Sequence, residues 1–239
     1  MAARLGVVSS MLLLVLVVAP SSANAAQDVQ CSGELTAVTV RNVTVPAGGS
    51  CTLHNSNVKG RVVASSASYF QATHTRISGD VAATDAQTLF VEKGSTVGGS
   101  VRASRVAQVF LFASRVRKNV LVDGATDQVF ICDSNIELGS IQVIRSARDI
   151  LIGGLPTGGC GGNSVRRGNM AVLWNSTDVQ LVISGNRFPR GNLIVSGNTG
   201  PSEKIVQGNF GGRRIACRAN AGQFRASNNR RWKSGACKP

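Results

Sequence analysis

Carboxylates are the first side chains to consider for catalysis, and ten of them lie in and after the repeated part of the chain. A glycosidase needs two carboxylates that face one groove, and a polysaccharide lyase needs a base with a cation or metal that stabilises the carbanion. The ten occur mostly singly, at turn-like positions: Asp80, Asp85, Glu92, Asp123, Asp127, Asp133, Glu137, Asp149, Asp178 and Glu203. The sequence therefore predicts no catalytic residue, and a carbohydrate-active enzyme is kept as the alternative.

Asp123, Asp127 and Asp133 form the closest acidic cluster. Such a cluster could hold calcium, but aspartates also cap turns, which is the interpretation that we favour. The histidines, His54 and His74, are twenty residues apart, and neither has a Ser-x-Gly elbow or a cysteine arranged as a nucleophile. No C-x2-C pair is present that would indicate zinc. We expect no metal site and no cofactor, and exposed corner positions for both histidines.

The basic residues give the chain its strongest chemical asymmetry. The formal net charge is +14, and from Lys204 onward there is no acidic residue. A surface of one sign attracts anionic polymers, and a tryptophan beside arginines adds a face on which sugars or bases stack. Alternatively, the charges only keep the protein soluble. The predicted anion-binding residues are Arg213, Arg214, Arg218, Arg225, Arg230, Arg231, Trp232 and Lys233.

Residues 1–25 have the features of a cleaved export signal. Arg4 gives a positive start, Val7 to Val18 is an apolar run, and Ala23-Asn24-Ala25 is a cleavage site. The apolar run is too short to span a bilayer comfortably, and no later segment is long and apolar enough to do so. Removal of Arg4 with the signal lowers the formal net charge to +13. We expect a secreted or cell-envelope-associated protein that is a monomer and does not insert into a membrane.

Short strands and tight turns are the elements that must position these side chains. Hydrophobic residues make up 43% of the chain and aromatic residues only 5%, and glycine, serine, asparagine and threonine fill much of the rest. From Asn55 onward the chain repeats every twenty residues over five blocks. An apolar-x-Gly-x-apolar motif recurs in the first three blocks, and a variant without the glycine occurs in the fourth. A phenylalanine recurs in a short strand of the first four blocks, and a leucine comes one residue late in the fifth: Phe70, Phe90, Phe110, Phe130 and Leu151.

A fixed period of this size is typical of a solenoid, in which each repeat forms one coil that buries its apolar face against its neighbours. An antiparallel sandwich is the alternative, but sandwiches rarely repeat in both spacing and residue type over five units. We therefore predict an all-β, single-stranded parallel β-solenoid with about twenty residues per coil. The four phenylalanines should stack in one ladder that points inward.

Six cysteines, an even number, predict three disulfides in an exported chain. Cys31 and Cys51 are twenty residues apart, as are Cys217 and Cys237, so each pair should lie one coil apart, within disulfide reach. This leaves Cys132 to pair with Cys160. The first two disulfides are expected to close the ends of the solenoid, where a terminal coil would otherwise fray and expose strand edges.

The chain then divides into four predicted parts: a signal peptide (1–25), a disulfide-capped first coil (26–54), regular coils (55–154), and irregular coils with a basic cap (155–239). The last part opens with a glycine-rich segment, Leu155 to Asn169, that should form a loop tethered by Cys160. Strand-like runs then resume, and the motif Ser-Gly-Asn occurs at 184–186 and again at 196–198.

The opening CSGELTAVTVRNVTVPAGGSCTL, Cys31 to Leu53, and the tail that begins GNLIVSGNTG resemble a group of small exported actinobacterial proteins. Their first segment reads roughly CxGxLxxxTVxNVxVPAGxxCTL. The resemblance covers nearly the whole chain after the signal, but in the middle the glycine motif degenerates and the loop with Cys160 is extra. It implies a right-handed parallel β-helix related in architecture to pectate-lyase-like folds, and it implies no particular activity.

These observations together predict a non-enzymatic protein that binds an anionic polymer through its basic C-terminal coils. Candidate partners are cell-wall phosphate, uronate polysaccharide and extracellular nucleic acid. The alternative is a polysaccharide lyase or glycoside hydrolase of the parallel β-helix class. An enzyme requires acidic groups that converge on one groove, whereas the binding protein requires only a contiguous basic face.

Overall fold

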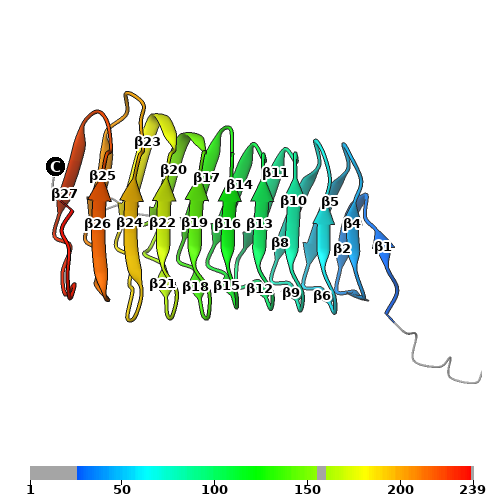
Figure 1. Ribbon diagram of the computed structural model, residues 1–239. Helices are drawn as coiled ribbons and strands as arrows, with labels where there is room; N and C mark the ends of the chain where they lie inside the picture. The colour runs from blue at the N-terminus through cyan, green and yellow to red at the C-terminus, as the bar shows by residue number, and fades with distance from the viewer. Residues whose placement is uncertain (1–25, 155–159, 238–239) are drawn as a thin grey trace, which may run out of the picture.

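The protein is a parallel β-solenoid. The computed structural model describes residues 26–154 and 160–237, so the predicted export signal lies outside the described residues. Within this part the chain makes about 10 turns of about 20 residues each and contains no helix (Figure 1). No described segment therefore forms a helix that could cross a membrane. The predicted all-β solenoid, its period and its parallel pairing are confirmed.

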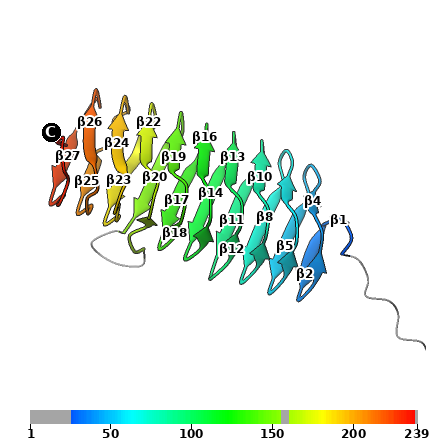
Figure 2. The same cartoon turned by 60° about the horizontal axis from the view of Figure 1, so that its bottom comes forward.

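Each turn contributes strands to sheets that lie on different sides of the stack, as the two views in Figure 1 and Figure 2 show. Sheet A contains β1 (Val29–Gln30), β4 (Val43–Val45), β7 (Val62–Ala64), β10 (Val81–Thr84), β13 (Val101–Ser104), β16 (Val120–Asp123), β19 (Ile141–Ile144), β22 (Met170–Leu173), β24 (Asn192–Ser196) and β26 (Arg214–Arg218). Every paired strand in it runs parallel to its neighbours.

Sheet B is also ten-stranded, and sheet C is narrower. Sheet B contains β2 (Gly33–Thr36), β5 (Ser50–His54), β8 (Tyr69–Thr73), β11 (Thr88–Glu92), β14 (Gln108–Phe112), β17 (Gln128–Cys132), β20 (Ala147–Gly153), β23 (Ser176–Ser184), β25 (Lys204–Gln207) and β27 (Phe224–Ser227). Sheet C contains β3 (Thr39–Val40), β6 (Asn57–Val58), β9 (Arg76–Ile77), β12 (Thr96–Val97), β15 (Arg115–Val116), β18 (Asn135–Ile136) and β21 (Ser164–Val165).

The core is one continuous apolar column along the axis of the stack. Alternate residues of each strand point inward, so Val81 and Ala83 of β10 are buried while Ala82 between them is partly exposed. Because each coil supplies only a few inward positions, small and β-branched side chains fill most of the column, which explains the low aromatic content.

The prediction of an inward ladder of four phenylalanines is wrong. Phe70 is fully buried, but its partner in the next coil is Leu89, and Phe90 pairs with Gln71. The step from β8 to β11 is one residue shorter than twenty, and a shift of one residue exchanges the inward and outward faces of a strand. Phe90, Phe110 and Phe130 therefore form a ladder on the outer face of sheet B, in which the rings of Phe90 and Phe110 stack with centroids 4.4 Å apart.

Asparagine ladders fill part of the interior of the last coils. Asn163, Asn186, Asn209 and Asn229 form one of these ladders, and the first three side chains are fully buried. Each of the first three asparagines donates from its backbone N–H and from Nδ2 to the Oδ1 atom of the next one, and also from Nδ2 to a carbonyl of a neighbouring coil. In the earlier coils serine and threonine occupy the equivalent positions. The Ser-Gly-Asn motif thus supplies an interior hydrogen-bond ladder and not only a corner.

The three predicted disulfides, Cys31–Cys51, Cys132–Cys160 and Cys217–Cys237, are confirmed. Their Cα atoms lie 5.5, 5.3 and 4.7 Å apart, which is the range that stacked coils provide. The first and third lie in the terminal coils. The glycine-rich loop is shorter than predicted, because Ser164 and Val165 already form β21 and continue sheet C.

Lys204 lies inside the solenoid and does not contribute to the basic surface. It occupies an inward position of β25, is fully buried, and donates from Nζ to the carbonyl oxygens of Gly200 at 2.7 Å and Ser202 at 2.8 Å. Burial lowers the pKa of this lysine below its ordinary value of 10.5. The folded state therefore binds the proton less tightly than the unfolded state does.

A pH-dependent stability difference follows from this burial. Because burial lowers the folded-state pKa, the protonated form of Lys204 is less stable in the folded protein than in the unfolded chain. The folded state therefore gains stability as the pH rises from the folded-state pKa to about 10.5, and it loses this stability as the pH falls through the folded-state pKa. The free energy of unfolding of the wild type, relative to Lys204→Met, should rise as the pH increases from neutral toward 10.5. Urea denaturation across this range checks the prediction. Lys233→Met, at an exposed lysine, is the control and should show no such trend.

Candidate anion-binding surface

Eight ion pairs among the described residues neutralise some of the basic residues, mostly in the first and middle coils. Most ion pairs join adjacent coils, as when Arg102 binds Asp80 at 2.8 Å and Arg105 binds Asp85 at 2.6 Å. The other pairs are Arg41–Asp28, Lys93–Glu92, Arg115–Glu137, Arg145–Asp123, Arg148–Asp127 and Arg225–Glu203. Each such exposed pair adds little stability, but it cancels charge locally. The net positive charge is therefore concentrated where arginines lack these partners.

The pKa values of the paired carboxyl groups follow from their partners. Hydrogen bonds from Arg41 and then Asn42 lower the pKa of Asp28 to about 2. The Arg105 guanidinium lowers the pKa of Asp85, and the backbone N–H of Ser100, followed by Arg102, lowers the pKa of Asp80. These groups stay ionised at neutral pH and keep their arginines occupied.

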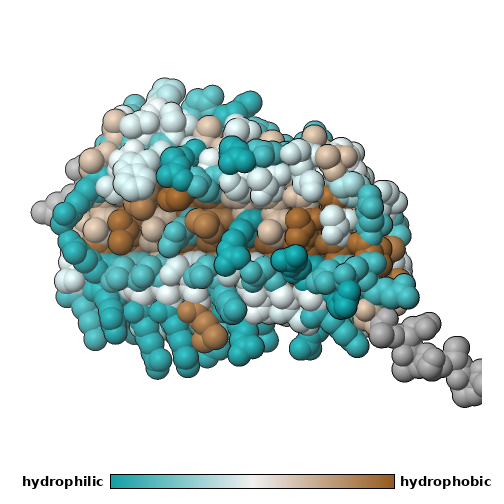
Figure 3. All heavy atoms as spheres, turned by 45° about the vertical axis from the view of Figure 1, so that its right-hand side comes forward, coloured by the Kyte–Doolittle hydropathy of each residue, from teal (hydrophilic) through white to brown (hydrophobic). Residues whose placement is uncertain are grey.

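Four arginines that form no ion pair with a carboxylate of the described residues line one groove. We call it the arginine groove, and it is lined by Ser164, Arg166, Arg167, Arg187, Pro189 and Arg190. Its volume is about 370 Å³, and no acidic side chain lines it. Figure 3 shows hydrophilic side chains projecting along the lower edge of the molecule, where Figure 1 places the strands of sheet C and the turns that follow them. The groove belongs to this edge.

The solenoid stacking itself brings these arginines together. Ser164 in β21, Arg187, Phe210 and Arg230 are paired in successive coils, so the ladder of sheet C continues beyond its last strand. The guanidinium of Arg187 lies 5.9 Å and that of Arg231 lies 5.0 Å from the centre of the Phe210 ring. The ring thereby holds one arginine of the groove and one arginine of the C-terminal cap on the same surface.

The eight predicted anion-binding residues do not form one surface. Arg230 is paired in the ladder of Phe210, and the backbones of Arg213 and Lys233 hydrogen-bond to the turns beside it, so these residues lie near the arginine groove. Arg214 and Arg218 lie on β26 in sheet A, where they line a separate groove of about 230 Å³. Arg225 lies on β27 in sheet B and binds Glu203 at 3.1 Å.

Trp232 is not an open stacking face. Its indole packs against Phe188 with ring centroids 5.5 Å apart, and it closes the C-terminal end of the core. Its Nε1 atom is buried and has no hydrogen-bond partner among the described residues. Trp232, one of the eight predicted residues, therefore packs against the end of the core.

The four arginines of the groove were missed in the sequence. A signal for two of them was present, because Arg-Gly-Asn occurs at residues 167–169 and again at 190–192, each time at the start of a strand of sheet A. The strands β22 and β24 that follow are paired, so the two motifs lie one above the other. Residues 166 and 167 fall within the predicted glycine-rich loop, so the sequence prediction does not relate the two motifs.

The carboxylates do not converge on one open groove in the described part of the chain. Asp123 binds Arg145, Asp127 binds Arg148 and Gln108, and Asp133 accepts a hydrogen bond from the Gly161 backbone. No group of three metal-ligating side chains occurs among the described residues. The imidazoles of His54 and His74 lie 5.9 Å apart, edge to face, at the corners of adjacent coils.

Asp149 differs from the paired carboxyl groups, because its pKa is raised and not lowered. It lies on the outer face of sheet B but is only 8% exposed, and its Oδ1 atom has no hydrogen-bond partner among the described residues. Burial, together with the nearby charge of Asp127, raises the pKa of Asp149, and a hydrogen bond from Gln180 opposes the rise. This environment favours the protonated acid.

The fold defines the class of this protein as a parallel β-solenoid with disulfides in its terminal coils. No protein family, no curated protein and no solved structure matches the chain. Because one fold serves many functions, the function has to be argued from the surface that the fold builds.

Proposed function

We propose that this protein is an exported, non-enzymatic β-solenoid that binds an anionic polymer along the arginine groove and the adjoining basic cap. The observation that carries the proposal is the groove itself, in which Arg166, Arg167, Arg187 and Arg190 line one depression with no carboxylate. Planar guanidinium groups donate paired hydrogen bonds to carboxylate and phosphate oxygens. Successive coils repeat the basic positions, so a chain-like ligand meets several of them.

The proposed location rests on different evidence. Three disulfides indicate an oxidising environment, and residues 1–25 have the pattern of an export signal. The resemblance of the Cys31 to Leu53 segment to small exported actinobacterial proteins supports the same location. Cell-wall phosphate, uronate polysaccharide and extracellular nucleic acid are the anionic polymers that such a protein would meet.

Neutralising two arginines of the groove should weaken polymer binding about tenfold, because two ionic contacts to the polymer are lost. The test variant is Arg167→Gln combined with Arg190→Gln. With double-stranded DNA as the probe, the slope of log K against log salt concentration should become less steep by about two. Binding to DNA, polygalacturonate and isolated cell wall is measured over a range of salt concentrations.

A matched control removes the same charge from another place. Arg102→Gln combined with Arg105→Gln lowers the net charge equally, but these arginines are already paired with Asp80 and Asp85. The control should bind each polymer within about twofold of the wild type, since the charge that it removes is locally cancelled. Equal losses in the two double variants, or retention that salt does not change, would reject the arginine groove as the binding surface.

The enzyme alternative is tested on the same preparations. A glycosidase needs two carboxyl groups at one site, and Asp149 and Asp127 are the neighbouring pair to test, because the charge of Asp127 contributes to the raised pKa of Asp149. Asp149 is nine-tenths buried, however, and Asp127 is bound to Arg148, so neither group lies free in a groove. Release of reducing or unsaturated ends from polygalacturonate, lost on Asp149→Asn, would favour the enzyme over the binding protein.

A further inference from the structure

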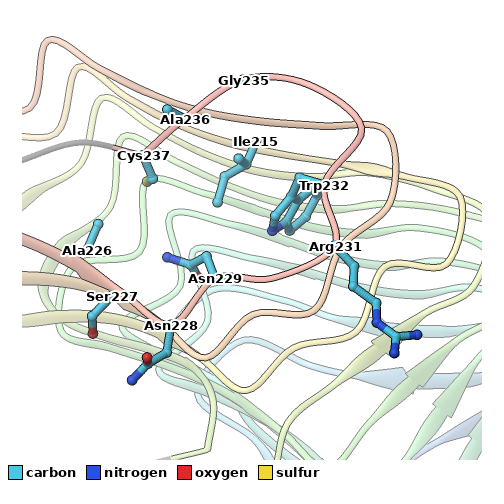
Figure 4. A pocket seen from close by; sticks show the side chains of 10 residues that line it. All are labelled: Ile215, Ala226, Ser227, Asn228, Asn229, Arg231, Trp232, Gly235, Ala236 and Cys237. Carbon is cyan, nitrogen blue, oxygen red and sulfur yellow. The ribbon is translucent and has the colours of Figure 1, made fainter.

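The C-terminal end of the solenoid contains a cavity that the arginine groove does not include. Its volume is about 420 Å³, within the range of small-molecule sites. Figure 4 shows the side chains of Ile215, Asn229 and Trp232 directed toward one opening, with the polypeptide of residues 234–237 closing one side. Arg231 also lines the cavity, but its guanidinium lies over the Phe210 ring.

The asparagine ladder ends in this cavity. Along the ladder, two N–H donors of one residue converge on a single oxygen of the next residue. Asn209 illustrates the geometry, because its backbone nitrogen lies 3.1 Å and its Nδ2 atom 3.0 Å from Oδ1 of Asn229. The same geometry occurs between Asn186 and Asn209. Each rung therefore binds one carbonyl-type oxygen between two donors.

Asn229 is the last rung and has no oxygen of this kind beyond it. Its Oδ1 accepts from Asn209 and its Nδ2 donates to the carbonyl oxygen of Val206 at 2.8 Å. Its backbone N–H and the second hydrogen of Nδ2 have no acceptor among the described residues. Because the other rungs hold these two donors in one orientation, the last rung keeps a preformed position for one oxygen atom.

The charge around this position favours an anion. The sequence after Glu203 contains no acidic side chain, and Glu203 itself is paired with Arg225 at 3.1 Å. Hydrogen bonds to a charged acceptor are stronger than those to a neutral carbonyl. The apolar part of the lining, which includes Ile215, Trp232 and Ala236, suits the carbon atoms of a small organic acid.

We propose that the terminal cavity binds a carboxylate group, one oxygen of which accepts from the backbone N–H and Nδ2 of Asn229. The carboxylate belongs either to a free organic acid or to the terminal unit of a uronate chain. The inference is independent of the arginine groove, because none of the four groove arginines lines this cavity.

Tryptophan fluorescence offers a local measurement. The chain has two tryptophans, and Trp174→Phe leaves Trp232 in the cavity lining as the single reporter. Sodium acetate and sodium galacturonate, which stand for the two sources, are titrated at constant ionic strength, with acetamide and sodium chloride as neutral and inorganic controls. Acetate or galacturonate should change the fluorescence and shift the backbone and side-chain amide resonances of Asn229, whereas acetamide and chloride should not.

The second asparagine ladder provides the matched variant. It runs from Asn175 through Asn198 to Asn220, and Asn220 is likewise a terminal rung but does not line the cavity. Asn229→Ala should weaken carboxylate binding about tenfold or more, because the hydrogen bond from Nδ2 to a charged group is lost while the backbone N–H remains. Asn220→Ala should leave binding within about twofold. Absence of carboxylate binding, an equal response to acetamide, or equal losses in both variants would overturn the proposal.

Discussion

Replacing Asn186 by leucine is expected to lower the free energy of unfolding by about 5 kcal/mol, because several buried polar groups lose their partners at once. Oδ1 of Asn186 accepts from the backbone and from Nδ2 of Asn163, each at 3.0 Å. Its Nδ2 donates to Ile152 at 2.8 Å and to Asn209 at 3.0 Å. Leucine has nearly the shape of asparagine, so the loss is one of hydrogen bonds and not of packing.

Urea denaturation followed by circular dichroism measures this effect. Asn57→Leu is the matched control, because Asn57 lies on the outer side of sheet C and its side chain makes no hydrogen bond to the described residues. The control should change the free energy of unfolding by no more than about 0.5 kcal/mol, as is usual for surface substitutions. Similar unfolding curves for the two variants would show that the ladder contributes little to stability.

Gly191→Ala is expected to cost about 3 kcal/mol or more, because the added methyl group would overlap backbone that cannot move independently. A Cβ atom at residue 191 would overlap the carbonyl oxygen of Gly168 in the coil below. The backbone N–H of Arg213 in the coil above donates to the carbonyl of Gly191 at 2.8 Å, so the turn is held on both sides. The substitution should therefore separate coils that form the arginine groove.

Two measurements distinguish this steric effect from a general loss of glycine flexibility. Gly48→Ala is the control, because its φ is +68° but the space around it is open, so only a backbone cost of about 1 kcal/mol is expected. Binding of DNA should weaken in Gly191→Ala, since Arg190 is adjacent, and should stay unchanged in Gly48→Ala. If both variants lose the same stability, close contact between coils does not explain the glycine at residue 191.

The proposed binding surface is a consequence of stacking and not of a particular loop. Ser164, Arg187, Phe210 and Arg230 come from four different coils, yet they form one ladder. Positions on one such ladder can change from coil to coil without a change in the core, because only the inward residues contact it. The basic character of the last coils can therefore vary independently of the fold.

The sequence determined the period, the parallel pairing and the three disulfides. The period and two of the disulfides depend on chain distance alone, since residues about twenty positions apart in a solenoid become neighbours about 4.8 Å apart. The third disulfide follows because two cysteines remain. Cys31 with Cys51 and Cys217 with Cys237 could be paired on that basis, and the structure confirms both. The charge imbalance of the tail was equally visible, because it requires only counting.

Only the tertiary structure decided which side chains face outward and which coils share a surface. The step from β8 to β11 is nineteen residues and not twenty, so Phe70 points inward and Phe90 points outward. An approximate period of twenty residues does not reveal a step that is one residue shorter. In the same way, Lys204 and Asn186 look like surface residues in the sequence but lie in the core, where backbone carbonyls or other asparagines satisfy them. The arginine groove depends on lateral contacts between coils, and such contacts are set by the exact register, which the linear order of residues does not contain.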